Sequence, residues 1–161
     1  MPKYMMLLLV VLAFGLVACE ADEPEQAAID PVPGVIPVAL VGTEMHALGQ
    51  QTYDQHCAAC HGAAGEGQFP EAPMQPDATG RIGAPPHDGT GHTWHHPDGL
   101  LVRYVIEGGL GDPDRFYPMP ALGGVLSDDQ VIAVIAYIKT MWSVEQQIAQ
   151  RDATLSTQQG G

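Results

Sequence analysis

The pattern of apolar and polar positions predicts three helices separated by long loops. The first should begin near Thr43, an expected N-cap, and carry its apolar side chains at helical spacing (Met45, Leu48, Thr52 and Tyr53). The second should begin at Asp98, the expected cap, and end at Gly108, because glycine is favoured just beyond a helix. The third should follow Ser127, where Gln130 completes a capping box, and bury one apolar stripe (Val131, Val134, Ile135, Ile138 and Trp142).

Residues 62–97 form the longer of the predicted loops, rich in glycine and proline and poor in apolar side chains. A loop of that length is unusual in a compact domain unless it wraps a bound cofactor. Ser143 predicts a short further helix, and we expect the residues after it to be disordered. Because no segment alternates with period two, the sequence predicts an all-α, loop-rich domain over 43–142, followed by a short helix and disordered tail over 143–161.

Residues 1–18 have the pattern of an export signal, with Lys3 ahead of an apolar run that is too short to cross a membrane comfortably. The sequence "LVAC" that ends at Cys19 resembles the lipobox of bacterial lipoproteins, which implies cleavage before Cys19 and a lipid on that residue. We therefore expect an exported protein, lipid-anchored to a membrane on the periplasmic, extracytoplasmic side. The alternative is an ordinary signal peptide with an incidental cysteine.

The stretch 19–42 is acidic at first and is then interrupted by four prolines, so we expect an extended tether. Over the whole chain, 19 Asp and Glu residues against 6 Lys and Arg give a formal net charge of −13. Such a surface excludes binding to nucleic acid or to an anionic lipid face by charge. Two interpretations stay open: attraction to a basic partner, and simple solubility.

The stretch "QHCAACHG", residues 55–62, carries the clearest chemical signal in the chain. Cys57 and Cys60 fit a redox dithiol, half of a zinc site or an attachment site for haem. A thioredoxin-like dithiol requires a βαβ setting and a structural zinc site usually requires a second cysteine pair, and the sequence offers neither. A histidine directly after the second cysteine, here His61, is typical of haem attachment, in which both thiols bond to the haem and the imidazole binds its iron. The sequence therefore predicts one covalently attached haem c.

The haem iron needs a sixth ligand, for which Met119 is the preferred candidate. It lies between Pro118 and Pro120, which stiffen the loop backbone and hold a weakly binding thioether in place. Met141 falls near the apolar stripe of the last helix and is better explained as a core residue. The other candidates are Met74, His87, His92, His95 and His96.

In order and spacing, these pieces resemble the monohaem class I cytochromes c over nearly all of residues 43–142. The resemblance rests on Gly49-x-x-x-Tyr53 before the cysteine motif, "APP" at 84–86, "MP" at 119–120 and an aromatic residue in the last helix. It implies a small, cytochrome c-like helical domain wrapped around the haem. In that fold the first and last helices of the domain cross, with Gly49 and Tyr53 against Val134 and Tyr137.

The resemblance also implies a role for Pro85, whose carbonyl should accept the N–H of His61, orient the imidazole and raise its basicity. Two residues further on, the family usually has an apolar residue, and this chain has His87. Four histidines and two aspartates lie between 87 and 98, around one tryptophan. They are His87, Asp88, His92, Trp94, His95, His96 and Asp98.

Two interpretations of this histidine-rich stretch stay open. His92, His95 and His96 offer imidazoles suited to copper or zinc, which predicts a second metal site. Alternatively, Trp94 and one or two of the histidines cover the haem edge or hydrogen-bond the haem propionates, and His96 leads into the following helix.

The resemblance implies an electron carrier rather than an enzyme, with an iron that cycles between ferrous and ferric states behind two protein ligands. Expected partners are other redox proteins: a quinol-oxidising complex, a copper protein, a terminal oxidase or a photosynthetic reaction centre. Two alternative functions stay open, a haem-based sensor or enzyme in which Met119 leaves the iron, and a copper-handling protein that uses the histidines. The chain also fits a fixed subunit of a larger redox complex.

Overall fold

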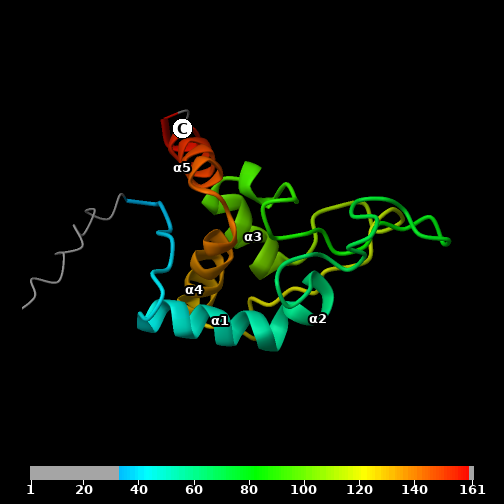
Figure 1. Cartoon of the computed structure of the whole chain (residues 1–161), viewed down its shortest axis with the longest axis horizontal. Helices are drawn as coiled ribbons and strands as arrows, with labels where there is room; N and C mark the ends of the chain where they lie inside the picture. Colours follow the sequence, from blue (N-terminus) through cyan, green and yellow to red (C-terminus); the bar gives the residue numbers. More distant parts are fainter. Residues whose placement is uncertain (1–32, 160–161) are drawn as a thin grey trace, which may run out of the picture. The chain divides into compact units, whose positions relative to one another are not determined.

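The computed structural model consists of helices joined by loops (Figure 1). The residues that it describes contain no β-strand. It describes residues 33–159; the expected signal peptide, Cys19 and most of the expected tether lie outside them. The α-helices are α1 (Glu44–His56), α2 (Ala58–His61), α3 (Asp98–Glu107), α4 (Asp128–Ile138) and α5 (Val144–Gln159). Two short 3₁₀ helices are η1 (Thr93–His95) and η2 (Lys139–Met141). Within 33–159, no helix is both long enough and apolar enough to cross a membrane.

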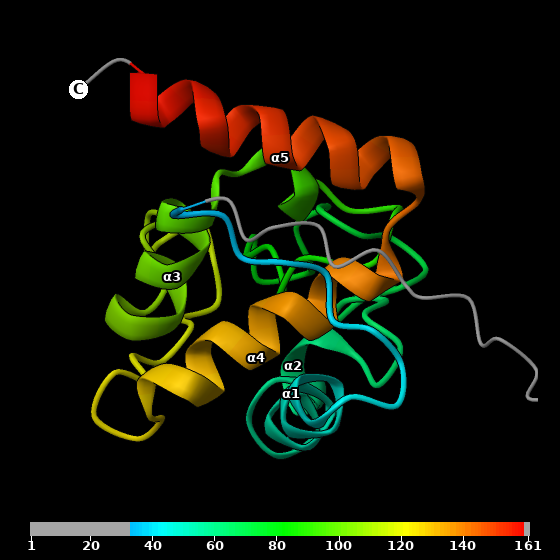
Figure 2. The same ribbon diagram turned by 90° about the vertical axis from the view of Figure 1, so that its left-hand side faces the viewer.

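Helices α1 and α4 cross in close contact and form the centre of the core. In Figure 2, α1 is seen nearly end-on while α4 runs across it. A Cβ added to Gly49 of α1 would overlap the carbonyl oxygen of Ala133 and lie 2.7 Å from the Cβ of Tyr137, so only glycine permits this approach. Tyr53 is fully buried beside Tyr137, with ring centroids 5.6 Å apart. The predicted crossing of the two helices is confirmed.

Among the caps of α1, α3 and α4, three ends agree with the sequence and one differs. Thr43 Oγ1 accepts the backbone N–H of His46 at 3.3 Å, and Ser127 and Gln130 form the predicted capping box. Gly108 ends α3 with a φ of 89°, which glycine adopts without strain. The prediction that Asp98 caps α3 was wrong, because Pro97 is the N-cap and makes no side-chain cap bond.

Asp98 instead belongs to a buried polar cluster that joins distant parts of the chain. Its carboxylate accepts the backbone N–H of Ile36 at 2.8 Å and pairs with the ammonium group of Lys139 at 2.7 Å. Lys139 Nζ also donates to the carbonyl of Ile36 at 2.6 Å. Both charged side chains are only 3% exposed, so the pair is held away from water.

The N-terminal segment that precedes α1 is therefore part of the domain, which corrects the predicted tether. Residues 33–42 have no helix, as expected, but Ile36 and Ala39 are buried in the core. Ala39 donates its backbone N–H to the carbonyl of Ala136 in α4 at 3.0 Å. A free tether on the N-terminal side must end before Ile36 rather than at residue 42.

Helix α5 continues to Gln159, so the expectation of disorder in residues 152–161 was wrong for 152–159. Ser143 caps it as predicted: its hydroxyl accepts the N–H of Gln146 at 3.3 Å, and the Gln146 side chain accepts the N–H of Ser143 at 3.0 Å. The helix packs on η1 and α3 (Figure 2). Its fully buried residues are polar, Gln150 and Thr154, and this is why an apolar pattern did not reveal it.

Candidate functional site

A cavity of about 350 Å³ lies between α2, α3, α4 and the loops that follow α2 and α3. This volume falls within the range of cavities that hold small molecules and cofactors. Cys57, Cys60, His61 and Met119 all line it, so the structure brings together four residues that the sequence singled out. Apolar side chains of α3 and α4 form much of the remaining wall (Leu101, Val105, Val134, Ile135 and Ile138).

The one-turn helix α2 places both thiols and the imidazole on the cavity. The backbone N–H groups of Cys60 and His61 both donate to the carbonyl of Cys57, at 3.1 and 2.9 Å, which fixes the turn. Burial, followed by the nearby Cys60, raises the pKa of the Cys57 thiol to about 11. A reactive redox dithiol requires a lowered thiol pKa, so this environment argues against thioredoxin-like chemistry.

His61 is buried and oriented by one hydrogen bond. Its Nδ1 donates to the carbonyl oxygen of Pro85 at 2.8 Å, because a carbonyl only accepts. Burial lowers the pKa of His61, although the bond to Pro85 acts in the opposite direction. The ring is thus held neutral with Nε2 unprotonated, which is the form that binds a metal.

His87 packs face to face on His61, with ring centroids 3.8 Å apart and an interplanar angle of 16°. Its Nδ1 is buried without a hydrogen-bond partner. Burial, and secondarily the electrostatic influence of the neighbouring titratable site His61, hold the pKa of His87 well below its ordinary value. His87 therefore serves as a neutral ring at a position where the resemblance implied an apolar side chain.

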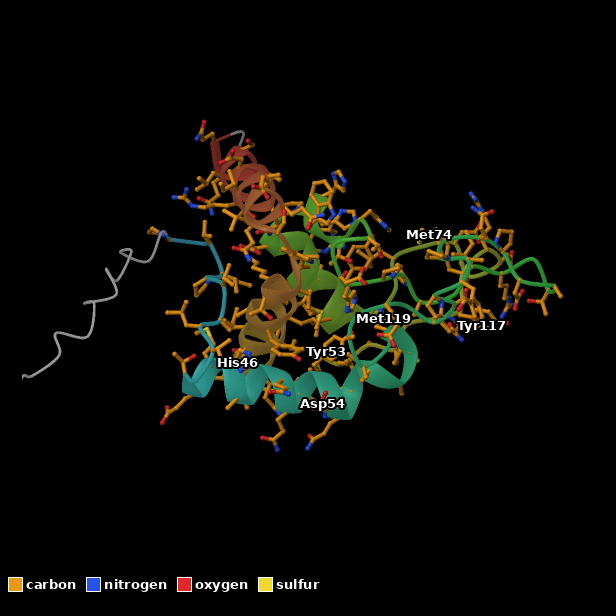
Figure 3. All side chains as sticks on the ribbon, in the orientation of Figure 1. His46, Tyr53, Asp54, Met74, Tyr117 and Met119 are labelled. Atoms are coloured by element: carbon orange, nitrogen blue, oxygen red, sulfur yellow. The ribbon has the colours of Figure 1, made fainter. Side chains whose placement is uncertain are left out.

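Met119 is half-buried and lies on the loop after α3, which returns against the C-terminal end of that helix (Figure 3). Gly109 donates its N–H to the Met119 carbonyl at 3.0 Å, and a Cβ on Gly108 would lie 2.7 Å from the same oxygen. Met74 also lines the cavity, from the loop after α2. Met141 does not line it and packs against the core, as the sequence suggested.

The loop of residues 87–97, here called the histidine loop, divides its side chains between the cavity and the outside. His92 and His96 line the cavity with ring centroids 5.3 Å apart, whereas His95 and Trp94 do not line it. Trp94 packs against the core and stacks on the exposed ring of His95 at 3.6 Å. Among the described residues, no group of three or more His, Cys, Asp or Glu side chains is arranged to hold a second metal ion.

Some lining residues were not singled out as site residues. Tyr104 of α3 lines the cavity beside His96, with ring centroids 5.8 Å apart, and Tyr117 lines it from the Met119 loop. Tyr104 lies three positions after the buried Leu101, so helical spacing was the available signal. Tyr117 lies on an irregular loop, where no periodic signal exists.

The donor set fits a covalently bound haem. Two thiols one helical turn apart, a neutral imidazole with a free nitrogen, a thioether and apolar walls are the groups that such a cofactor requires. Tyr53 also stabilises the motif. Its hydroxyl donates to the carbonyl of Gly62 at 3.0 Å and fixes the C-terminal end of α2.

Comparison with known proteins agrees with this geometry. Residues 46–142, more than half of the chain, match the family Cytochrome c. The chain is 30% identical over 97 residues to cytochrome c6 of Tetradesmus obliquus, which covers 57% of this chain and 85% of that protein. It is 32% identical over 92 residues to cytochrome c6 of Chlorolobion braunii, with the same coverage of 57% and 85%. The chain therefore belongs to the cytochrome c family, and Cys57 and Cys60 fit that family's motif for covalent attachment of haem c.

Proposed function

We propose that this cytochrome c carries single electrons between redox proteins, with His61 and Met119 as the two axial ligands of its haem iron. Haem-based electron transfer is the chemistry of the family to which the chain belongs. The proposal for the ligands rests on one observation. The neutral imidazole of His61 and the thioether of Met119 line the same cavity as the two attachment cysteines.

Two protein ligands leave no open position on the iron, which favours electron transfer over binding of a substrate. A methionine ligand raises the reduction potential, and burial of the haem among apolar side chains acts in the same direction. Contacts within the chain hold both proposed ligands. Pro85 orients His61, and the close contact of Gly108 and Gly109 with the Met119 backbone fixes the Met119 loop.

The cellular setting belongs to the same proposal. The "LVAC" sequence ending at Cys19 supports export and a lipid anchor on the extracytoplasmic side of a membrane. The partners would be other redox proteins, of the kinds that exchange electrons at that surface: a quinol-oxidising complex, a copper protein, a terminal oxidase or a reaction centre. The net charge of −13 supports a partner with a basic docking surface.

The optical spectrum of the haem-loaded protein tests the ligands directly. We expect a low-spin spectrum with a methionine–iron charge-transfer band in the oxidised state, and no change when carbon monoxide is added to the reduced protein. Met119→Ala should keep the haem attached, lower the potential and let carbon monoxide bind. Met74→Ala is the matched control, because Met74 lines the same cavity and should leave the spectrum unchanged.

Each other outcome selects a different function. A high-spin wild-type spectrum, or prompt carbon monoxide binding, would favour a sensor or enzyme with an open iron. Loss of the charge-transfer band in Met74→Ala rather than in Met119→Ala would transfer the ligand role to Met74. The anchor is tested separately: Cys19→Ser should release a red, soluble protein from the membrane fraction, and retention there would refute the lipid anchor.

A further inference from the structure

The cavity contains no Lys, Arg, Asp or Glu among the described residues that line it. Haem carries two propionate groups, which are anionic at neutral pH and are costly to bury without a partner. Histidines are thus the only lining side chains that can supply a positive charge. Of these, His61 and His87 are stacked together as neutral rings, and His56 directly precedes the attachment cysteine Cys57.

His92 and His96 remain, and they form a pair. Their rings meet edge to face with centroids 5.3 Å apart, and the His96 ring also contacts Tyr104. His92 is exposed and His96 is half-buried, so the pair lies where the cavity reaches the surface. Propionates that bound a positively charged pair at such a position would stay partly in water, which would limit the cost of their desolvation.

The position of the pair agrees with the chemistry of the cofactor. The propionates of haem lie on the edge of the macrocycle opposite the vinyl carbons to which cysteines bond. Cys57 is the N-cap of α2 and Cys60 lies within it, next to α1. His92 and His96 are the two caps of η1, which packs against α5 (Figures 1 and 2). The histidine pair and the thiols therefore line one cavity from two different parts of the fold.

Helix α5 and Trp142, two residues before it, hold the backbone of the histidine loop and of Asp98, the residue that follows the loop. Four side chains at intervals of four residues make the contacts. Trp142 Nε1 donates to the carbonyl of His87 at 2.7 Å, and Gln146 Nε2 to that of Gly89 at 2.8 Å. Gln150 Nε2 donates to the carbonyl of His96 at 3.2 Å, and Thr154 Oγ1 accepts the N–H of Asp98 at 3.0 Å. Bonds to backbone groups fix the loop and leave the histidine rings free to face the cavity.

We propose that His92 and His96 bind the haem propionates, and that α5 positions the loop which carries them. This inference rests on the proposed function only in requiring a haem with its thioether edge at α2. The axial ligands can be wrong and the propionate site right, because the two sets of residues are different.

The charges around the pair determine its pH dependence. The His92 ring meets that of His96 and His95 is its neighbour in sequence, the ring of Tyr104 from α3 contacts it, and Gln150 of α5 donates to the His96 carbonyl. Asp98, which also contacts Gln150, is balanced by Lys139. Burial, then the charges of His92 and His95, lower the pKa of His96 in the absence of an anion. A propionate acts in the opposite direction and keeps His96 protonated to higher pH.

The test compares His92→Phe/His96→Phe with wild type, as haem-loaded full-length protein. Phenylalanine preserves the ring and removes the charge and the N–H donors. We expect the resonance Raman bending bands of the propionates to shift in the double variant. We also expect two changes in the midpoint potential. Below pH 6 the double variant should have a lower potential than wild type, because the positive charge is gone. As the pH rises, its potential should fall much less than that of wild type. His95→Phe is the matched control, because its ring lies on the same loop and outside the cavity.

The outcomes separate this proposal from the proposed function. The proposal is overturned if the propionate bands and the pH dependence of the potential are the same in the double variant and wild type, or if His95→Phe changes them equally. The charge-transfer band of the same samples reports the axial ligands independently. If the double variant fails to mature, His92→Phe alone decides the question, since His92 is exposed and its replacement does not disturb the core.

Discussion

The contact of α1 with α4 and the contact of α5 with the histidine loop hold the same domain together by different means. The first is apolar and dry: Gly49 lets the backbones approach, and Tyr53 and Val134 are fully buried. The second is polar: side chains of α5 bind backbone carbonyls of a loop that is distant in sequence. The buried residues of α5 are Gln150 and Thr154. Close packing secures the crossing of the helices, whereas hydrogen bonds secure the loop above the cavity.

This difference matters because apolar packing and polar contacts respond differently to substitution. A packed helix crossing fails when volume is added, and it is insensitive to pH. A buried polar cluster fails when one partner is removed, since the group left behind keeps its desolvation cost. The polar contact of α5 with the histidine loop is therefore the one that single polar substitutions should disturb most.

The largest expected effect is at Lys139, whose removal leaves the buried carboxylate of Asp98 without its charge partner. We expect Lys139→Met to lower the free energy of unfolding by about 3–5 kcal/mol, the range for breaking a buried ion pair from one side. Denaturant unfolding of the haem-loaded protein at pH 7 measures it. Replacing both residues, as Asp98→Asn/Lys139→Met, should recover much of the loss, because neither change then leaves a buried charge. A double variant no more stable than the single one would mean that the charge pair is not the source of the effect.

The second prediction concerns the apolar crossing. Gly49→Ala forces the Ala133 carbonyl and the Tyr137 side chain to move, and we expect a loss of about 1–3 kcal/mol in the free energy of unfolding. Gly99→Ala is the matched control: Gly99 lies in α3 with open space around it, and alanine there should be neutral or stabilising by up to about 1 kcal/mol. Equal losses at both positions would show that glycine matters here for the helix backbone rather than for the crossing.

The sequence predicted the apolar region well and the polar region poorly, for a physical reason. Periodic apolar residues such as Val131 and Val134 report burial directly, and Ser127 with Gln130 marks a helix start through local hydrogen bonds. The bonds from Gln146 to the Gly89 carbonyl and from the Ile36 N–H to Asp98 join residues more than fifty positions apart. No local pattern encodes such a pair, so the sequence suggested disorder for the second half of α5 and a capping role for Asp98.

The same reasoning applies to the site. The spacing of Cys57, Cys60 and His61 indicated haem attachment because the chemistry is local. The histidines at 92, 95 and 96 were indistinguishable in sequence, and only the fold separates the two that line the cavity from the one that stacks on Trp94.

The third prediction weakens the polar contact without removing a charge. Gln150→Leu deletes the donor to the His96 carbonyl and to Asp98 Oδ1, and we expect a loss of about 1–3 kcal/mol in unfolding free energy. Relative to wild type, backbone hydrogen exchange in this variant should become faster in the histidine loop and change less in α1. Ser156→Ala provides the control, because Ser156 is an exposed residue of the same helix whose hydroxyl bonds only within it. Uniformly faster exchange would indicate global destabilisation instead of a released loop.

The smallest effect should come from a polar contact at the surface, between the loops that carry Met74 and Met119. Hydrogen bonds from Thr79, then from Tyr117, lower the pKa of Asp77 to about 2, and Tyr117 Oη donates to its carboxylate at 2.7 Å. Because this pKa lies below the ordinary value of 3.8, the contact contributes stability above pH 4 and loses it as the pH falls towards 2. Tyr117→Phe removes the second donor and should raise the pKa of Asp77, as measured by NMR titration of its carboxyl carbon, while the free energy of unfolding at pH 7 changes little. Thr79→Val removes the first donor and should raise that pKa further. If Tyr117→Phe instead destabilised the protein at pH 7 as much as Gln150→Leu, exposure would not be what separates weak polar contacts from strong ones in this fold.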